Sequence, residues 1–137
     1  MKKILTKSDL GQELVEYALM LPLFLILVLG IVDLGRAVYY YSAMNNVVRE
    51  GARYGSIHLE DSGVNNTVCG LVTSRAIGVN ISCDDVTTSF DFNEGTVKVT
   101  VVYPFVPVSQ IITGIFGLNQ LDLEVSSIMQ LEYVPIP

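Results

Sequence analysis

An uncharged apolar run near the N-terminus constrains this chain more than any other feature. No charged residue occurs from Tyr17 to Val32. As a helix, this run covers about 24 Å at 1.5 Å per residue. The hydrocarbon core of a bilayer is about 30 Å thick and usually takes about 20 residues. We therefore predict a membrane-spanning helix that is slightly short, unless Glu16 or Asp33 lies near an interface or Glu16 is neutralised.

The charges on the two sides of this run differ in sign. Residues 1–11 contain three lysines and one aspartate, a net charge of +2, whereas residues 60–137 contain two basic and nine acidic side chains, a net charge of −7. The positive-inside rule places the lysines in the cytoplasm and the acidic C-terminal part outside it. The acidic part has no basic stripe to neutralise phosphates, which argues against a nucleic-acid partner.

The helix is predicted to continue well beyond the apolar run. Apolar residues recur at helical spacing up to Ser56, and no proline occurs after Gly35 in this stretch. We predict one helix over residues 12–57, with its first half in the lipid bilayer and its second half in water. Pro22 should kink the membrane half or free a carbonyl. A cleaved secretory signal is the alternative, but "GIVDLGRA" at 30–37 is a poor match to a small-x-small cleavage site.

Residues 58–137 are predicted to form a small α+β domain outside the cytoplasm. A short helix is expected over residues 67–77, with Gly78 as its stop. Side chains then alternate with period two, which is typical of strands, and "NEG" at 93–95 is a turn signal. About three antiparallel strands are expected; the alternating stretches are Val79–Cys83, Phe90–Phe92, Val97–Tyr103 ended by Pro104 and Pro107, and Leu121–Tyr133.

The two cysteines, Cys69 and Cys83, are a candidate disulfide. A cysteine pair outside the cytoplasm tends to be oxidised. The bridge would close a loop of about 15 residues and stabilise the fold by roughly 3 kcal/mol in the chain-entropy model. Two buried free thiols are the alternative reading.

Four features of the sequence allow two interpretations each. Gly51 and Gly55 have the spacing of a close helix–helix contact, but they also suit a loosened helix end. The tyrosines at 39–41 fit an interfacial aromatic belt or contacts to the domain core. The apolar stretch 109–120 fits a short helix over the sheet or a loop that meets a partner or the membrane surface. Asp33 and Arg36 could pair, but we favour two headgroup-level charges that mark the outer boundary of the bilayer.

The sequence shows no pattern of residues that would support catalysis or metal binding. His58 is the single histidine, in a polar loop without metal-ligand spacing. Asp84 and Asp85 fall short of a calcium loop. Nucleophile elbows, phosphate-binding glycine loops and serine-histidine-acid sets are lacking. We therefore expect no enzyme activity, cofactor, metal or small-molecule substrate.

The N-terminal region resembles type IV pilin-like proteins. A basic leader is followed by Gly11 and, five residues later, by Glu16 in an apolar helix. The pair Glu16-Tyr17 is similar to the Glu-Tyr signature of Tad-type (tight adherence) pilins. "VEYALMLPLFLILVLGIVDLGRAVYYYSAMNNVVREGARYG", with its internal Pro22, the acid and arginine within 30–36 and the Ala-Arg-rich end, resembles the TadE-like family. The stretches "VTVVYPFVP" and "SSIMQLEY" are also similar to that family's sheet.

The resemblance implies a structural role in a Tad-type (type IVc) pilus, a cell-adhesion fibre. The leader, residues 1–11, would be cut by a prepilin peptidase between Gly11 and Gln12. Glu16 would then meet the freed N-terminal amine of a neighbouring subunit, so that two opposite charges offset each other's desolvation. The implied partners are other pilin-like subunits, the pilus assembly platform, the peptidase and the bilayer of the cytoplasmic (inner) membrane.

Two features distinguish this chain from a major pilin of that system. Residue 12 is glutamine where many type IV pilins have an apolar aromatic residue, and the chain is longer than a leader plus a helix. The residue at position 12 is less constrained in Tad-type proteins, whereas the greater length favours a minor pilin or pseudopilin. The alternative is an uncleaved, signal-anchored binding module that holds a partner outside the membrane, with residues 111–118 as its contact.

Overall fold

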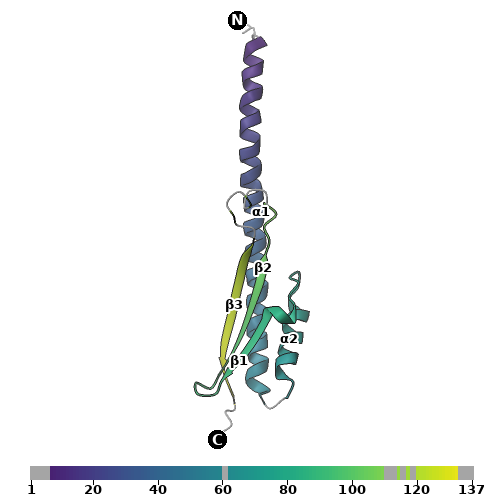
Figure 1. The fold of residues 1–137 in the computed structure, drawn as a ribbon, viewed down its shortest axis with the longest axis vertical. Helices are drawn as coiled ribbons and strands as arrows, with labels where there is room; N and C mark the ends of the chain where they lie inside the picture. Colours follow the sequence, from purple (N-terminus) through teal and green to yellow (C-terminus); the bar gives the residue numbers. More distant parts are fainter. Residues whose placement is uncertain (1–6, 60–61, 110–113, 115–116, 118–119, 133–137) are drawn as a thin grey trace. The chain divides into compact units, whose positions relative to one another are not determined.

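The computed structural model describes residues 7–59, 62–109, 114, 117 and 120–132, with side chains from Gly11 onward. Its elements in chain order are helix α1 (Lys7–Ile57), helix α2 (Val64–Arg75), a 3-10 turn η1 (Cys83–Asp85) and strands β1 (Val86–Asp91), β2 (Thr96–Phe105) and β3 (Leu121–Gln130). The strands form one antiparallel sheet in the order β1-β2-β3. The predicted α+β class, with a long helix, a short helix and three antiparallel strands, is confirmed (Figure 1).

The contacts divide the chain into two compact units. The first, which we call the anchor unit, comprises Met1–Gly35 and Pro107–Asn119. The second, the body, comprises Arg36–Val106 and Gln120–Pro137. Helix α1 contributes to both units, since its first part lies in the anchor unit and its second part in the body.

Helix α1 runs continuously through Pro22 and ends at Ile57. It begins at Lys7, so the predicted start at Gln12 was too late. Proline removes a backbone donor from a helix interior, and membrane helices tolerate this loss when the freed carbonyl is satisfied locally.

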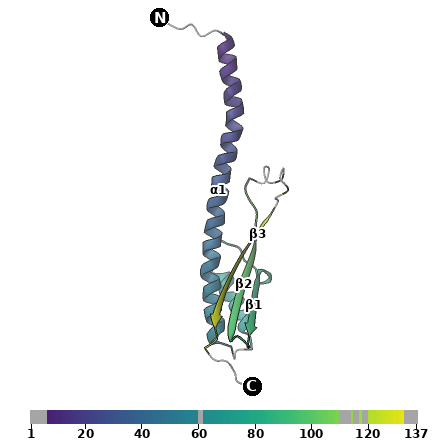
Figure 2. The ribbon, with the colours of Figure 1, turned by 90° about the vertical axis from the view of Figure 1, so that its left-hand side faces the viewer.

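The core of the body is built mostly from valines of three elements. Met44 and Val48 of α1 are fully buried, and so are Val68 and Val72 of α2. Strand β2, the central strand, adds fully buried Val97, Val99 and Val101. Each fully buried valine or methionine contributes about 1.5–3 kcal/mol of transfer free energy. Both ribbon views show the sheet and α2 packed against this part of α1 (Figures 1 and 2).

Two glycines allow α2 and the sheet to approach α1 closely. A Cβ atom added at Gly51 would lie 3.0 Å from Val72 Cγ2 and 3.3 Å from Val68 Cγ1. A Cβ atom added at Gly55 would lie 3.3 Å from Val97 Cγ2. Of the two readings of this glycine spacing, the structure supports the helix–helix contact. The contact is made within the chain, between α1 and α2.

The predicted strand over residues 79–83 is wrong, although two of the three side chains expected on its inner face are buried, while Cys83 is exposed. Val79 and Ile81 are both buried in the core. Their backbone groups, however, form turn-like bonds, from Val79 N to Ala76 O (3.2 Å) and from Ile81 N to Val79 O (3.2 Å). Gly78 precedes them with φ +76°, a conformation that favours glycine. Period-two burial therefore arose here from two successive turns rather than from pairing with a neighbouring strand.

Pro104 does not end β2, which continues to Phe105. Strand β1 pairs with β2 only as far as Val101, whereas β3 pairs with β2 up to Phe105. Pro104 therefore lies where β2 has a strand on one side only. A proline is tolerated at such a local edge because its missing N–H removes no ladder hydrogen bond there.

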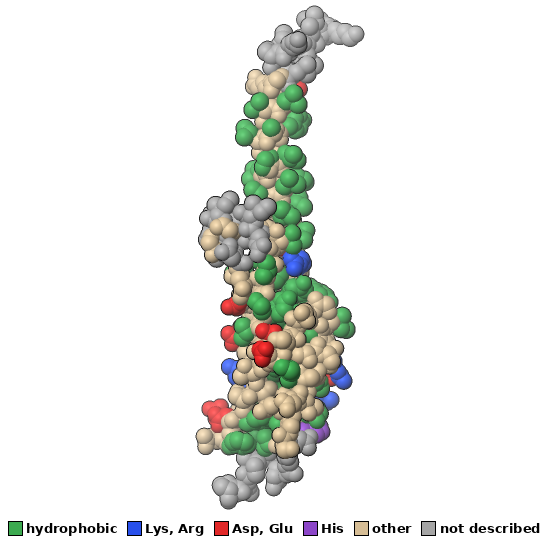
Figure 3. All heavy atoms as spheres, turned by 45° about the vertical axis from the view of Figure 1, so that its right-hand side comes forward, with side chains coloured by type: hydrophobic (Ala, Val, Ile, Leu, Met, Phe, Trp, Pro, Cys, Tyr) green, Lys and Arg blue, Asp and Glu red, His purple; other side chains and the backbone are tan. Residues whose placement is uncertain are grey.

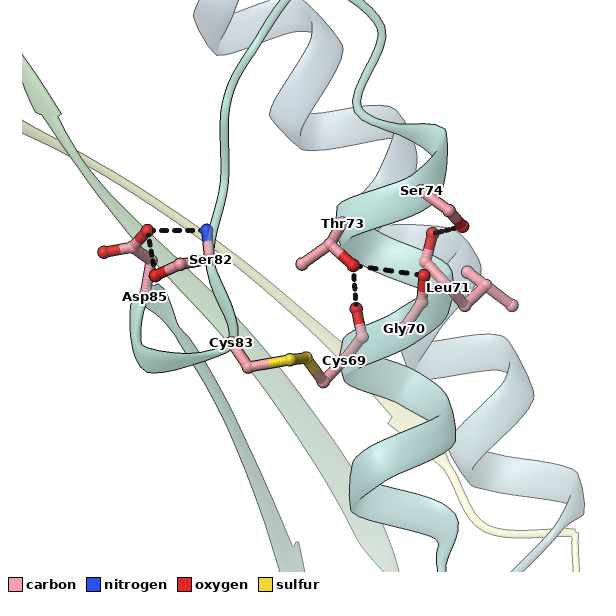
Figure 4. The surroundings of a disulfide bond; sticks show 8 residues. All are labelled: Cys69, Gly70, Leu71, Thr73, Ser74, Ser82, Cys83 and Asp85. Carbon is pink, nitrogen blue, oxygen red and sulfur yellow. Dashed lines mark hydrogen bonds between the residues drawn. A yellow bond between two sulfur atoms is a disulfide. The ribbon is translucent and has the colours of Figure 1, made fainter.

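A disulfide joins α2 to the segment that leads into the sheet. Cys69 of α2 is bonded to Cys83 at the start of η1, with their Cα atoms 5.5 Å apart (Figure 4). The same turn is held by Asp85, whose Oδ2 accepts hydrogen bonds from Ser82 N (2.8 Å) and Ser82 Oγ (2.9 Å). This capping box fixes the backbone on which Cys83 is presented to α2.

Candidate functional site on the N-terminal helix

The first part of α1 exposes apolar side chains on all sides. Between Leu14 and Val32, the exposed fractions range from 37% to 73% for the large aliphatic, phenylalanine and methionine side chains on the surface of the helix. Figure 3 shows hydrophobic side chains over the visible face of this segment. So large an apolar surface is unfavourable in water and marks a region that another apolar phase or another protein covers.

Within the described part of the chain, one helix is long and apolar enough to cross a membrane. It is the segment of α1 from Gly11 onward, and it meets the criterion by length and composition alone. Only 6% of the 18-residue apolar stretch of this helix is buried inside the structure, so that stretch is not part of the core. The segment therefore fits a membrane anchor.

Tyr17 and Met20 lie where two grooves on this segment adjoin. Glu13, Glu16, Tyr17 and Met20 line the first groove. Tyr17 and Met20 also line the second, which is almost wholly apolar and continues to Phe24. Glu13 and Glu16 are three residues apart and share one side of the helix. A partner helix that fills the apolar groove would therefore lie next to these carboxylates.

Neither glutamate has a hydrogen bond or an ion pair with any residue that the structure describes, and both are exposed. A charged side chain costs up to about 3 kcal/mol at the centre of a bilayer and less near its rim. When the helix is in lipid, the charge of Glu16 therefore has to be hydrated, protonated or paired with a cation that is not among the described residues. A partner helix that supplies such a cation would be held at the level of Glu16 along α1.

Gly11 and Gln12, the predicted processing residues, both lie within α1. A Cβ atom added at Gly11 would meet nothing within 4 Å. The fold of this chain therefore places no steric demand for glycine at position 11. If glycine is required there, the requirement comes from a molecule that binds this segment.

Asp33, whose predicted position at the headgroup level stays a prediction, is buried and binds a segment distant in the sequence. It is 8% exposed. One carboxylate oxygen accepts a hydrogen bond from Val108 N (2.7 Å); the other accepts bonds from Ser109 N (2.9 Å) and Ser109 Oγ (2.5 Å). All these groups belong to the anchor unit. No local pattern in the sequence could reveal partners 75 residues away.

Arg36 and the neighbouring tyrosines face the core of the body. The Arg36 guanidinium lies 5.7 Å from the ring centre of Tyr40 and 5.4 Å from that of Phe105. Tyr40 also packs edge-on against Tyr103, with ring centres 5.6 Å apart, and Tyr39 donates a hydrogen bond to Ile77 O (3.0 Å). Of the two readings of the tyrosine run, the structure supports core contacts for Tyr40, whereas Tyr39 and Tyr41 are each 51% exposed.

The remaining candidate residues have structural partners. His58 stacks on Tyr54 with ring centres 4.1 Å apart, and its Nδ1 lies 3.1 Å from Tyr54 O. Among the described residues, no group of three or more His, Cys, Asp or Glu side chains could hold a metal ion. Residues 111–118, the predicted partner-contact or sheet-covering stretch, lie largely outside the part that the structure describes.

The exposed apolar helix and the small α+β body together fit a membrane-anchored, pilin-like protein. Residues 11–53 match the protein family described as TadE-like protein, so the predicted resemblance to that family is confirmed over this segment. The match covers less than half of the chain and includes Gly11, Glu16, Tyr17 and the Asp33–Arg36 stretch. No curated protein and no solved structure matches the chain. The family match suggests a minor pilin associated with a Tad pilus.

Proposed function

We propose that this chain is a structural minor pilin or pseudopilin of a Tad-type pilus. It is made with a leader, residues 1–11, that a prepilin peptidase removes between Gly11 and Gln12. The remaining helix stays in the inner membrane, with the body outside the cytoplasm, until the subunit joins the pilus or its base. The assembly platform and other pilin-like subunits are its partners.

The observation that carries this proposal is Glu16, an exposed carboxylate without a partner among the described residues, inside a segment that matches the TadE-like family. The match begins at Gly11, the residue after which the cut would fall. Removal of the leader would create an N-terminal amine at Gln12, one turn from Glu16. The exposed apolar surface beside Glu16 supports packing against helices of neighbouring subunits.

Pairing between subunits gives the carboxylate a physical role. The amine of one subunit and Glu16 of the next would each be costly in lipid alone, but together each offsets the other's desolvation. The pair forms at one axial offset between the helices, so it would fix their register. Apolar packing supplies contact area, and the charge pair selects the alignment.

The body would remain outside the cytoplasm. Three lysines precede the apolar run, and lysines are retained on the cytoplasmic side. The disulfide between Cys69 and Cys83 agrees with this orientation, because disulfides persist in oxidising compartments.

The mass of the N-terminal peptide, measured on protein taken from membranes, tests processing. We expect the chain to start at Gln12. A second measurement uses Gly11→Leu, which should retain the leader, and Gly30→Leu as a matched control, since both positions have open space around them. A chain that starts at Met1 or Lys2 in the wild type would contradict the proposal and favour an uncleaved, signal-anchored binding module.

Incorporation into the pilus fraction tests the role of Glu16. Glu16→Gln keeps the shape and removes the charge, so it should leave cleavage intact and reduce incorporation at least 100-fold, as expected for a buried charge pair broken on one side at about 3–5 kcal/mol. Glu13→Gln is the matched control, one turn away on the same groove and equally free of partners among the described residues. Normal assembly of the Glu16→Gln protein would refute this role.

A further inference from the structure

The two cysteines of the disulfide in the body differ in their access to solvent. Cys69 is 7% exposed, whereas Cys83 is classed as exposed. Cys69 lies in the middle of α2, three residues before fully buried Val72, and residues at this spacing share one side of a helix. Cys83 begins η1, a turn in which no residue is buried. One end of the bridge is therefore enclosed and the other is open to water.

This difference matters because disulfide exchange is a substitution at one particular sulfur. A thiolate attacks one of the two sulfurs and forms a mixed disulfide with it, and the other sulfur leaves as a thiolate. The attack comes from the side opposite the leaving sulfur. For Cys69 Sγ this is the side of α2 itself, whereas for Cys83 Sγ it is the side of η1 (Figure 4). The fold therefore hinders attack on Cys69 and leaves Cys83 accessible.

Contacts other than the bridge hold both cysteines in place. In α2, Thr73 Oγ1 donates a hydrogen bond to Cys69 O (3.0 Å). On the other side, Asp85 Oδ2 accepts hydrogen bonds from Ser82 N and Ser82 Oγ and closes the turn that carries Cys83. The two Cα atoms are 5.5 Å apart, within the range that a disulfide spans. When the bridge opens, Cys69 would therefore stay within reach of Cys83.

We propose that the fold makes Cys83 the residue through which thiol–disulfide oxidoreductases break and form this bridge, with Cys69 as the resolving cysteine. The partner is a protein with a pair of redox-active cysteines. The proposal holds whether or not the chain joins a pilus.

In reduction, a thiolate of the partner attacks Cys83 Sγ. A bond forms between these two sulfurs and the bond to Cys69 Sγ breaks; its electron pair leaves on Cys69 Sγ, which takes a proton from water. The partner's second thiolate then displaces Cys83, so the partner becomes a disulfide and both cysteines of this chain become thiols. In oxidation, the Cys83 thiolate attacks the partner's disulfide, and the Cys69 thiolate then attacks Cys83 Sγ and releases the partner as a dithiol.

Capture of the mixed disulfide on the wild-type chain tests this assignment. The probe is reduced thioredoxin whose resolving cysteine is replaced by serine, so that it can attack a disulfide but cannot complete the reduction. It is mixed with the bridged full chain in detergent, and acid stops the reaction at early times. Peptide mass mapping then locates the bonded cysteine. We expect at least about 90% of the captured thioredoxin on Cys83, with Cys69 as a free thiol.

The same capture in urea is the control for burial. In the unfolded chain neither sulfur is enclosed, so the two cysteines should be captured within about threefold of each other. An equally strong preference for Cys83 in urea would overturn the proposal, because the preference would then come from neighbouring residues along the chain and not from the fold.

Two single-cysteine variants form a matched pair, since each keeps one thiol. With oxidised glutathione in detergent, Cys69→Ser, which keeps Cys83, should form a mixed disulfide at least about tenfold faster than Cys83→Ser, which keeps Cys69. Urea unfolding of both variants shows whether the body is folded without the bridge. If it is not folded, the two rates should be alike, and the thioredoxin measurement, which needs no substitution in this chain, decides.

Two further outcomes would overturn the proposal. One is capture on Cys69, or equal capture on both cysteines, in the folded chain. The other is capture of the unfolded chain alone, which would mean that the fold closes the whole bridge to exchange. Failure of leader cleavage or of Glu16-dependent assembly would change neither measurement, so this proposal and the proposed function fail separately.

Discussion

The two parts of α1 differ in how their apolar residues are distributed around the helix. Between Gly11 and Gly35 the side chains are exposed on all sides, apart from buried Asp33 and partly buried neighbours. Between Arg36 and Ile57 one side is buried against α2 and the sheet and the other is polar and exposed. A helix that is apolar all round needs a covering phase from outside, whereas a one-sided helix builds its own core. The first part of this continuous helix thus fits a membrane anchor, and the second part is the scaffold of the body.

A pair of methionines on the same helix gives the sharpest test of this difference. Met44 is fully buried and Met20 is 59% exposed. Met44→Ala should lower the free energy of unfolding of the body by about 2–5 kcal/mol, since it removes a large buried side chain and leaves a cavity. Met20→Ala should change it by less than about 0.5 kcal/mol. Urea unfolding of the full chain in detergent measures both, and equal effects would mean that the two parts of α1 are not energetically distinct.

The disulfide should stabilise the body alone. Replacement of both cysteines, Cys69→Ser with Cys83→Ser, removes a cross-link with a sequence separation of 14. The free energy of unfolding should fall by about 3 kcal/mol, chiefly because the unfolded chain gains freedom. Thermal unfolding with and without reductant checks this: the wild type should respond to reductant and the double variant should not. A response of the double variant to reductant would contradict the assignment.

The close approach of α2 to α1 predicts a smaller effect. Gly51→Leu should destabilise the body by about 1–3 kcal/mol, because even a Cβ atom there meets Val72 at 3.0 Å. Gly70→Leu is the matched control within α2, with nothing within 4 Å of its added Cβ, and leucine favours a helix over glycine. It should therefore be neutral or slightly stabilising. If both substitutions lowered the free energy of unfolding equally, the loss would come from the helices themselves and not from the contact between α1 and α2.

Local patterns in the sequence predicted the elements well where one physical cause dominates. The end of α1 at Ile57 and the alternation along β3 follow from helical spacing and from period-two burial. The patterns were wrong where tertiary context decides. The stretch 79–83 has strand-like burial without a strand partner, and Pro104 remains in β2 because β1 has already ended beside it.

The candidate site was predictable to the same limited extent. Glu16 was identified because an acid at the edge of an apolar helix is costly, which is a local argument. The burial of Asp33 was not predictable, because its hydrogen-bond donors, Val108 and Ser109, come from far along the chain.

The smallest expected effect concerns the ion pair between Glu50 and Arg75, which links α1 to α2. Their side chains are 37% and 58% exposed, so water screens the pair and its contribution should stay below about 1 kcal/mol. Glu50→Gln and Arg75→Gln, combined in a double-mutant cycle and followed by urea unfolding, measure the coupling directly. A coupling well above 1 kcal/mol would require that the pair be shielded from water by something that covers this side of the body. In that case the second part of α1, like the first, would be covered by another molecule.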